Sequence, residues 1–196
     1  MDFDAVVLAG GRGSRLGGIS KAQLQRDGVS LLALALRATA GARNVVVVGD
    51  VESTHGYRVA RENPPYAGPV AAIAAGLAEL APESSPFTLI LACDIPDSAS
   101  AVLLLRASAA NLTSVDSATT TGIDAVIAID EDDQEQYLLA IYSTGVLARR
   151  LASIIVNDAS MRQLTHGMAF DRVLVPSGST ADVDTWADAA TLGVTR

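Results

Sequence analysis

The first half of the chain alternates between short runs of consecutive apolar residues and longer stretches rich in helix formers. Residues 5–9 (AVVLA), 45–49 (VVVVG) and 87–92 (FTLILA) are apolar except for Thr88. Runs of this kind are typical of strands that are buried on both faces of a sheet. Between them, residues 31–43 favour a helix, and Pro69 begins a second helical stretch that Pro82 ends. The pattern predicts parallel strands joined by helices.

The second half of the chain repeats the alternation less regularly. We expect a helix over residues 99–110, an exposed loop over 111–122, and strands over 124–129 and 136–142 that pair as a hairpin across an acidic turn. Helices over 144–155, 160–166 and 185–192 and a strand over 172–176 complete the pattern. The sequence therefore predicts an α/β fold: a single domain, residues 1–196, built as a three-layer α/β/α sandwich around a Rossmann-like sheet that is mostly parallel.

Three unusual segments follow predicted strands. They are the glycine-rich loop after the first strand, a turn that ends in Gly68-Pro69, and Asp94 after residues 87–92. In open α/β sheets, ligands bind outside the carboxyl ends of the strands. We therefore expect these three segments to converge on one binding site.

Composition excludes several classes of protein. The net charge of −8 and the pI of about 4.6 argue against nucleic acid or an anionic membrane as a partner. Cys93 is the sole cysteine, so the chain has no internal disulfide and no zinc site built on cysteines, and a buried inert thiol is the favoured interpretation. Acidic residues near the start and the absence of any apolar stretch of about 18 residues lead us to expect a soluble, cytoplasmic protein.

The densest group of cations lies in residues 8–21, LAGGRGSRLGGISK. Five glycines let backbone N–H groups turn toward an anion, and three basic side chains supply charge, which suits a polyphosphate. The alternative is a solvated turn whose charges face water. The spacing fits neither familiar phosphate loop: the third glycine of G-x-G-x-x-G falls on Leu16, and a Walker loop would need lysine where Ile19 stands.

At these residues the sequence resembles the nucleotidyltransferases of the molybdenum-cofactor group, of the molybdopterin-guanine dinucleotide biosynthesis protein A type. The likeness runs from LAGGRGSRLGGISKAQL through DGVSLL, ENPPYAGPVAAI and LACDIP to DVDTW, and together these segments span residues 5–188. The resemblance implies a transfer of a nucleoside monophosphate from a triphosphate to a phosphorylated acceptor, with release of pyrophosphate.

Such a reaction requires positioning of the reactants and neutralisation of negative charge. We assign Arg15 and Lys21 to the triphosphate and the leaving pyrophosphate, which is also the role that the resemblance implies; the role of Arg12 stays open. We expect the remaining nucleotide contacts from Gly68 and from the backbone of the loop, with the base and ribose near the first four residues and the phosphates near the last two: Leu8, Ala9, Gly10, Gly11, Gly13 and Ser14.

Carboxylates provide the candidate metal site. Asp94, at the end of a strand, is a natural Mg²⁺ ligand, although it could instead cap a turn. Asp182 and Asp184 alternate in an extended DVD segment and should point to the same side. The resemblance suggests that Asp184 helps to hold the metal, and a helix N-cap is its alternative role.

Glu62 is the candidate for selecting the base. A carboxylate can accept two hydrogen bonds from the N1–H and N2–H₂ groups of guanine, which favours GTP over CTP. Glu62 lies six residues before Gly68, where guanylyl-type relatives often carry an acid. The alternative is an exposed acid at the end of a strand.

The resemblance implies molybdenum-molybdopterin as the phosphorylated acceptor and transient contact with molybdenum-cofactor enzymes. The segment EQYLLAIY lacks the proline and histidine of relatives, which leaves the acceptor open. A transferase using CTP or another acceptor, and a nucleotide-binding regulator or chaperone without turnover, are the alternatives. His55, His166 and the acidic turn EDDQE are expected to be surface or packing features rather than metal ligands.

Overall fold

A computed structural model describes residues 1–11, 13–52, 56–114 and 122–196 of the chain. Its centre is a seven-stranded sheet in the order β5-β4-β1-β6-β8-β7-β9. The strands are β1 (Phe3–Leu8), β4 (Val45–Val48), β5 (Arg58–Ala60), β6 (Phe87–Ala92), β7 (Ala125–Ile129), β8 (Glu135–Ser143) and β9 (Phe170–Leu174). β8 runs antiparallel to both β6 and β7, and the other pairs are parallel. The mixed, mostly parallel sheet that the sequence predicts is confirmed, including the β7–β8 hairpin.

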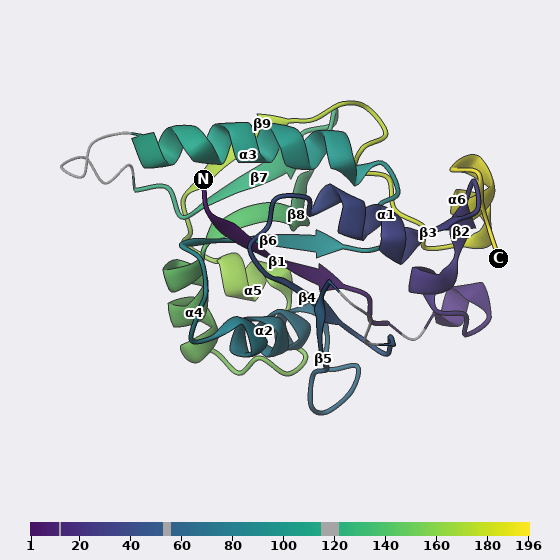
Figure 1. The fold of residues 1–196 in the computed structure, drawn as a ribbon, viewed down its shortest axis with the longest axis horizontal. Coiled ribbons are helices and arrows are strands. Elements are labelled where there is room, and N and C mark those ends of the chain that lie inside the picture. Colours follow the sequence, from purple (N-terminus) through teal and green to yellow (C-terminus); the bar gives the residue numbers. More distant parts are fainter. Residues whose placement is uncertain (12, 53–55, 115–121) are drawn as a thin grey trace.

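Helices cover both faces of this sheet (Figure 1). α1 (Leu31–Ala38) and α3 (Ser98–Ser114) pack on one face, and α2 (Pro69–Leu80), α4 (Thr144–Ala152) and α5 (Met161–Thr165) pack on the other. All six residues of β1 are buried, because apolar side chains from both helical layers meet it. This double burial explains the apolar runs in the sequence.

A small second sheet closes one end of the molecule. It consists of β10 (Val194–Thr195), β2 (Gln25–Arg26) and β3 (Val29–Ser30), and it lies beside α6 (Trp186–Thr191) (Figure 1). A separate apolar cluster joins these parts, and its buried members are Leu16, Leu24, Leu31, Val183, Ala189 and Val194. This cluster packs the glycine-rich loop against the DVD segment, although the two lie near opposite ends of the sequence.

Several predicted boundaries were wrong. The helix predicted over residues 31–43 ends at Ala38, because the chain turns at Thr39 and Gly41 has a φ of +89°. The loop predicted from residue 111 begins later, since α3 continues to Ser114; the rest of that loop, up to residue 121, lies outside the described residues. The helix predicted over 144–155 ends at Ala152, and the strand predicted over 172–176 spans Phe170–Leu174.

The short strands β2, β3, β5 and β10 were not predicted, because two or three residues carry too little pattern to be recognised. Among the described residues, no helix is both long enough and apolar enough to cross a membrane.

Candidate active site

The carboxyl ends of β1 and β6 lie side by side and bring the glycine-rich loop next to Asp94. Leu8 is in register with Ala92, and the backbone N–H of Cys93 donates a 3.0 Å hydrogen bond to the carbonyl of Leu8. The glycine-rich loop follows directly after β1, and Asp94 lies just after the end of β6. The predicted convergence of these segments therefore follows from the parallel pairing of two buried strands.

The loop folds back on itself around Gly13. Gly13 has a φ of +54°, and its carbonyl accepts 2.9 Å hydrogen bonds from the N–H groups of Leu16 and Gly18. A Cβ at this position would lie 2.2 Å from the carbonyl oxygen of Ile19, so only glycine fits. After this turn a short 3₁₀ helix (η2, Lys21–Gln23) begins with Lys21, which the fold thus aims at the end of β6.

Lys21 lies at the centre of an ionic cluster. Its Nζ is 2.7 Å from Oδ2 of Asp94 and also donates a short hydrogen bond to Oδ1 of Asp184. Arg15 contacts the other oxygen of Asp184, with Nη1 at 3.3 Å from Oδ2. Partial burial lowers the pKa of Lys21, but the charges and hydrogen bonds of the two aspartates outweigh it and raise the pKa above its ordinary value. Lys21 is therefore a cation at neutral pH.

Carboxylate oxygens of Asp94, Asp182 and Asp184 lie within 4.8 Å of one another. The backbone N–H of Val183 donates a 3.0 Å hydrogen bond to the carbonyl of Asp94, which holds the DVD segment beside β6. Burial, together with the negative charges of Asp94 and Asp184, raises the pKa of Asp182. As predicted, Asp182 and Asp184 are on the same side of their segment.

The N-cap alternative for Asp184 was wrong. The N-cap of α6 is Thr185, whose side chain accepts a hydrogen bond from the N–H of Asp188 in a capping box. The carboxylate of Asp184 instead faces Lys21 and Arg15.

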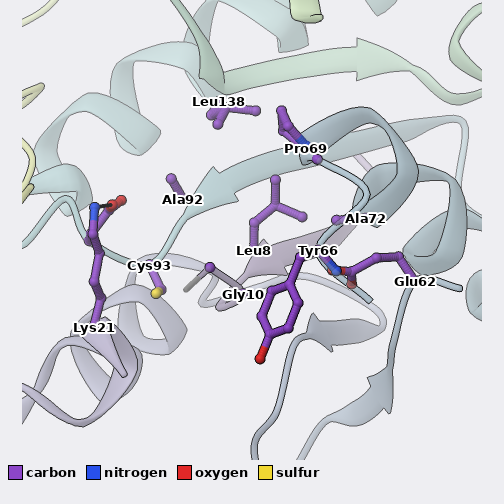
Figure 2. Close-up of a pocket in the computed structure, with 13 residues that line it drawn as sticks. Leu8, Gly10, Lys21, Glu62, Tyr66, Pro69, Ala72, Ala92, Cys93 and Leu138 are labelled. Carbon is purple, nitrogen blue, oxygen red and sulfur yellow. Dashed lines mark hydrogen bonds and ion pairs between the residues drawn. The ribbon is translucent and has the colours of Figure 1, made fainter. Parts of the chain in front are cut away.

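A cleft of about 440 Å³ extends from Lys21 and Asp94 at one end to Glu62 and Tyr66 at the other (Figure 2). Its floor and walls are mostly apolar or glycine: Leu8, Gly10, Gly11, Gly68, Pro69, Ala72, Ala92, Cys93 and Leu138. A second cavity of about 470 Å³ adjoins it and shares Gly10, Gly11, Glu62 and Tyr66, with Ala9 among its other lining residues. Gly13, Ser14 and Arg15 line neither of these two cavities.

Glu62 is buried, with 8% of its surface exposed, so the alternative of an exposed acid was wrong. It follows β5, the short strand that pairs with β4. Its Oε1 accepts a 2.9 Å hydrogen bond from the backbone N–H of Tyr66, whereas its buried Oε2 has no partner within the described part of the chain. A buried carboxylate oxygen without a donor is costly, which is typical of a site that awaits a ligand.

The other candidates behave as ordinary structural residues. Cys93 is buried, and burial raises the pKa of its thiol, which opposes a role as a nucleophile. Asp130 organises the hairpin turn by accepting hydrogen bonds from the N–H groups of Asp132 and Gln134. Of the described residues, only the Asp94 group forms a cluster that could hold a metal, and Arg12 and His55 lie outside the described residues.

Sequence reasoning missed Tyr66 and Leu138 as parts of the cleft. Tyr66 lies between Glu62 and Gly68, which are both predicted site residues. That position in the sequence could have identified Tyr66 as part of the cleft. Leu138 enters the cleft from β8 at a register irregularity opposite Ile127 and Ala128, and nothing in the local pattern predicts which side chain points inward there.

Residues 5–173 match the family described as the MobA-like NTP transferase domain, which covers most of the chain. The chain belongs to this family. The resemblance recognised in the glycine-rich loop is therefore confirmed, and the match includes Lys21, Glu62 and Asp94 but ends before the DVD segment.

Comparison with individual proteins agrees with membership of the MobA-like family. The chain is 32% identical over 101 residues to a molybdenum cofactor guanylyltransferase from Ralstonia nicotianae (strain ATCC BAA-1114 / GMI1000). That similarity spans about half of each protein, 48% in both cases.

Two solved structures share the fold over nearly the whole chain. Molybdopterin-guanine dinucleotide biosynthesis protein A from Archaeoglobus fulgidus has a TM-score of 0.68 at 18% identity and 97% coverage of each chain. The 2-C-methyl-D-erythritol 4-phosphate cytidylyltransferase from Thermus thermophilus has a TM-score of 0.69 at 17% identity and 98% coverage of each chain. At these identities the likeness shows the fold and does not indicate which nucleotide the cleft binds.

Proposed function

We propose that this protein is a Mg²⁺-dependent guanylyltransferase that transfers GMP from GTP to the phosphate of molybdenum-molybdopterin and releases pyrophosphate. The observation that carries the proposal is that one cleft joins a buried acid, Glu62, to the cation and carboxylates around Lys21 and Asp94. An acid suited to guanine lies at one end, and groups suited to phosphates and a metal lie at the other.

The acidic cluster has the right donors for a magnesium ion. Oxygen ligands from carboxylates are what Mg²⁺ prefers. The ammonium group of Lys21 already lies between Asp94 and Asp184, which supports the view that this position favours a positive charge. Asp94 and Asp184 would hold the ion, and when bound it would neutralise the charge that develops on the triphosphate.

The chain's own groups would position the reactants. In the reaction, an oxygen of the acceptor phosphate forms a bond to the α-phosphorus of GTP, and the bond from that phosphorus to the β-phosphate oxygen breaks. Lys21 would bind the triphosphate, and Arg15, whose side chain is largely exposed, would meet the departing pyrophosphate at the mouth of the site. The backbone at Gly10 and Gly11 lines both cavities and would contact the nucleotide between its base and its phosphates.

Glu62 would select guanine. Its Oε2 lacks a donor among the described residues, and guanine presents N1–H and N2–H₂ side by side. Cytosine has no such pair of adjacent donors, so it could not make both hydrogen bonds to the carboxylate. Because loss of a hydrogen bond at a buried polar group is expensive, the expected preference for GTP over CTP is about tenfold or more.

The acceptor is proposed from the similarity to the guanylyltransferase of Ralstonia nicotianae, whose name gives the molybdenum cofactor. Within the cleft, Pro69 and Leu138 form the wall away from Glu62 and Tyr66, where an acceptor could approach (Figure 2). In the course of the reaction the protein would also contact the enzymes that receive the product.

The first experiment measures which triphosphate the protein binds. Each of the four ribonucleoside triphosphates is added with Mg²⁺, and the midpoint of thermal unfolding is recorded, since a ligand that binds only the native state raises it. We expect the largest increase with GTP. A larger increase with CTP would favour a cytidylyltransferase and contradict the role of Glu62.

The second experiment measures catalysis. Pyrophosphate release from GTP should require molybdenum-molybdopterin and should fall by about a hundredfold or more in Asp94→Ala. Asp132→Ala, which removes a carboxylate from the exposed hairpin turn, is the matched control and should retain activity. Binding of GTP without pyrophosphate release over a panel of phosphorylated acceptors would instead indicate a nucleotide-binding regulator.

A further inference from the structure

Tyr66 holds an unusual position in the loop between β5 and α2. Its φ is +65°, in the left-handed region that bulky side chains rarely adopt. Its backbone N–H donates to Oε1 of the buried Glu62, and this bond fixes the loop in that conformation. Unfavourable backbone conformations that are held in place beside a cavity are typical of functional sites.

The ring of Tyr66 borders the space beside Glu62. Tyr66 as a whole residue is 47% exposed, although it is one of the few aromatic residues in the chain. It lines both the cleft and the adjoining cavity, and Figure 2 shows it projecting from the Glu62 end, with Gly10 beside it and Lys21 at the far end. Together, Tyr66 and the backbone of Gly10 and Gly11 flank the space in which a group bound to Glu62 would lie.

We propose that the ring of Tyr66 is the stacking surface for the nucleotide's base, while Glu62 reads the edge of that base. This inference rests on the proposed nucleotide-binding function and adds a second positioning residue to it. A flat heteroaromatic base gains binding energy from an aromatic ring at its face, whatever its pattern of donors and acceptors. Stacking and edge recognition are thus assigned to two different residues and make different predictions.

The test compares two variants by titration calorimetry with Mg²⁺ and three probes: GTP, CTP and inorganic tripolyphosphate. Tyr66→Leu keeps an apolar side chain but removes the aromatic face. We expect it to weaken both nucleotides by roughly tenfold, within the range of about 5- to 150-fold that corresponds to loss of one base–aromatic stack. Tripolyphosphate, which has no base, should bind as tightly as it does to the wild-type protein.

Glu62→Gln should behave differently, since it keeps the ring and changes only the edge contact. It should weaken GTP and leave CTP unchanged. Tyr66→Phe retains the aromatic face and serves as the matched control, with both nucleotides bound as in the wild-type protein. Because leucine and phenylalanine both keep a side chain at the positive φ, backbone strain is comparable in these variants.

A second measurement reports stacking directly. In the double variant Tyr66→Trp/Trp186→Phe, the introduced indole is the only tryptophan, and GMP should quench its fluorescence. Wild-type affinity of Tyr66→Leu for GTP and CTP, or no quenching by GMP, would overturn the role of Tyr66 while leaving the proposed function in place. Failure of the wild-type protein to bind any triphosphate would overturn both.

Discussion

Nζ of Lys21 lies 2.7 Å from Oδ2 of Asp94, at the junction of the glycine-rich loop and the end of β6. The same nitrogen reaches Asp184, so one ammonium group joins two carboxylates from distant parts of the sequence. If Asp94 and Asp184 hold a metal during the reaction, Lys21 competes with that metal in the free protein. Arrival of the triphosphate would give Lys21 new partners and leave the carboxylates to the ion.

Lys21→Met should therefore bind a divalent ion more tightly when no nucleotide is present. Removal of the ammonium group frees the two carboxylate oxygens that it contacts and takes away a positive charge close to the ion, while Arg15 still contacts Asp184. Two unit charges about 4 Å apart interact by about 4 kcal/mol at an effective dielectric constant of about 20. Because solvent weakens this repulsion at a partly exposed site, we expect the dissociation constant of the metal ion to fall by about tenfold. Mn²⁺ titrated into the protein and followed by electron paramagnetic resonance measures the dissociation constant.

Pyrophosphate release by the same variant should fall by about a hundredfold or more, because the triphosphate loses the cation that Lys21 provides. Arg26→Met removes a cation that pairs with Asp97 outside the acidic cluster, and it should leave Mn²⁺ affinity unchanged. Weaker Mn²⁺ binding by Lys21→Met would contradict competition between lysine and metal.

Arg26 and Asp97 give a prediction about pH and stability. Nη1 and Nη2 of Arg26 lie 2.7 and 2.6 Å from the two carboxylate oxygens of Asp97, and this pair links β2 to the segment before α3. The hydrogen bonds from Arg26 lower the pKa of Asp97. A carboxyl whose pKa is lower in the folded state stabilises the protein above its unfolded pKa of about 3.9, and this stability is lost as the pH falls through the folded value.

Arg26→Met should accordingly lower the free energy of unfolding at pH 7 by about 1 kcal/mol, since both side chains are partly exposed. The difference from wild type should shrink as the pH is lowered below about 4. Urea unfolding at a series of pH values measures it, with Arg37→Met, an exposed residue of α1, as the control. A difference that stays constant down to a pH of about 3 would show that Asp97 is not responsible.

The arrangement of the sheet and the place of the site could be predicted from the sequence because both follow from short apolar runs with helical stretches between them. Strands buried on both faces have a continuous pattern, and the residues after them must meet at one edge. The network around Lys21 could not be predicted in the same way. It depends on the packing of Leu16 and Val183 in one cluster and on the hydrogen bond from Val183 to Asp94, which join segments far apart in the sequence.

The burial of Glu62 could not be predicted from the local sequence either. It depends on β5, a strand of three residues that pairs with β4, and on the turn that brings the N–H of Tyr66 back to the carboxylate. Short strands and turns of this kind are fixed by tertiary contacts rather than by periodicity. The pattern of residues along the chain therefore identifies Glu62 as a candidate, but it does not predict that Oε2 of Glu62 is buried without a hydrogen-bond donor among the described residues.

Glu62→Gln should make the free protein more stable while it weakens GTP binding. The wild-type carboxylate is buried without a cation or a donor at Oε2 within the described chain, and a neutral amide of the same shape is less costly to bury. We expect the free energy of unfolding without nucleotide to rise by about 1 kcal/mol. Chemical unfolding in the absence and presence of GTP measures both effects, and a drop in stability without GTP would mean that the carboxylate is satisfied in solution.

α2 packs closely on the sheet at Gly76, its one glycine. A Cβ at this position would lie 2.5 Å from Cγ1 of Val6 and 3.1 Å from Cγ2 of Val48. Both valines lie in strands that are fixed by pairing on either side, so the helix would have to move outward. Because α2 follows Gly68 and begins at Pro69, which both line the cleft, an outward movement would also disturb the nucleotide site.

Gly76→Ala should lower the free energy of unfolding by about 1–3 kcal/mol, the usual cost of overpacking a core, despite the better helix propensity of alanine. Gly145→Ala in α4 is the matched control, because its Cβ would meet only Nη1 of Arg149 at an ordinary 3.6 Å. That variant should be as stable as the wild type or up to about 1 kcal/mol more stable. Urea unfolding of the two variants measures the difference in stability. Equal stabilisation by both substitutions would contradict close packing of Gly76 against Val6.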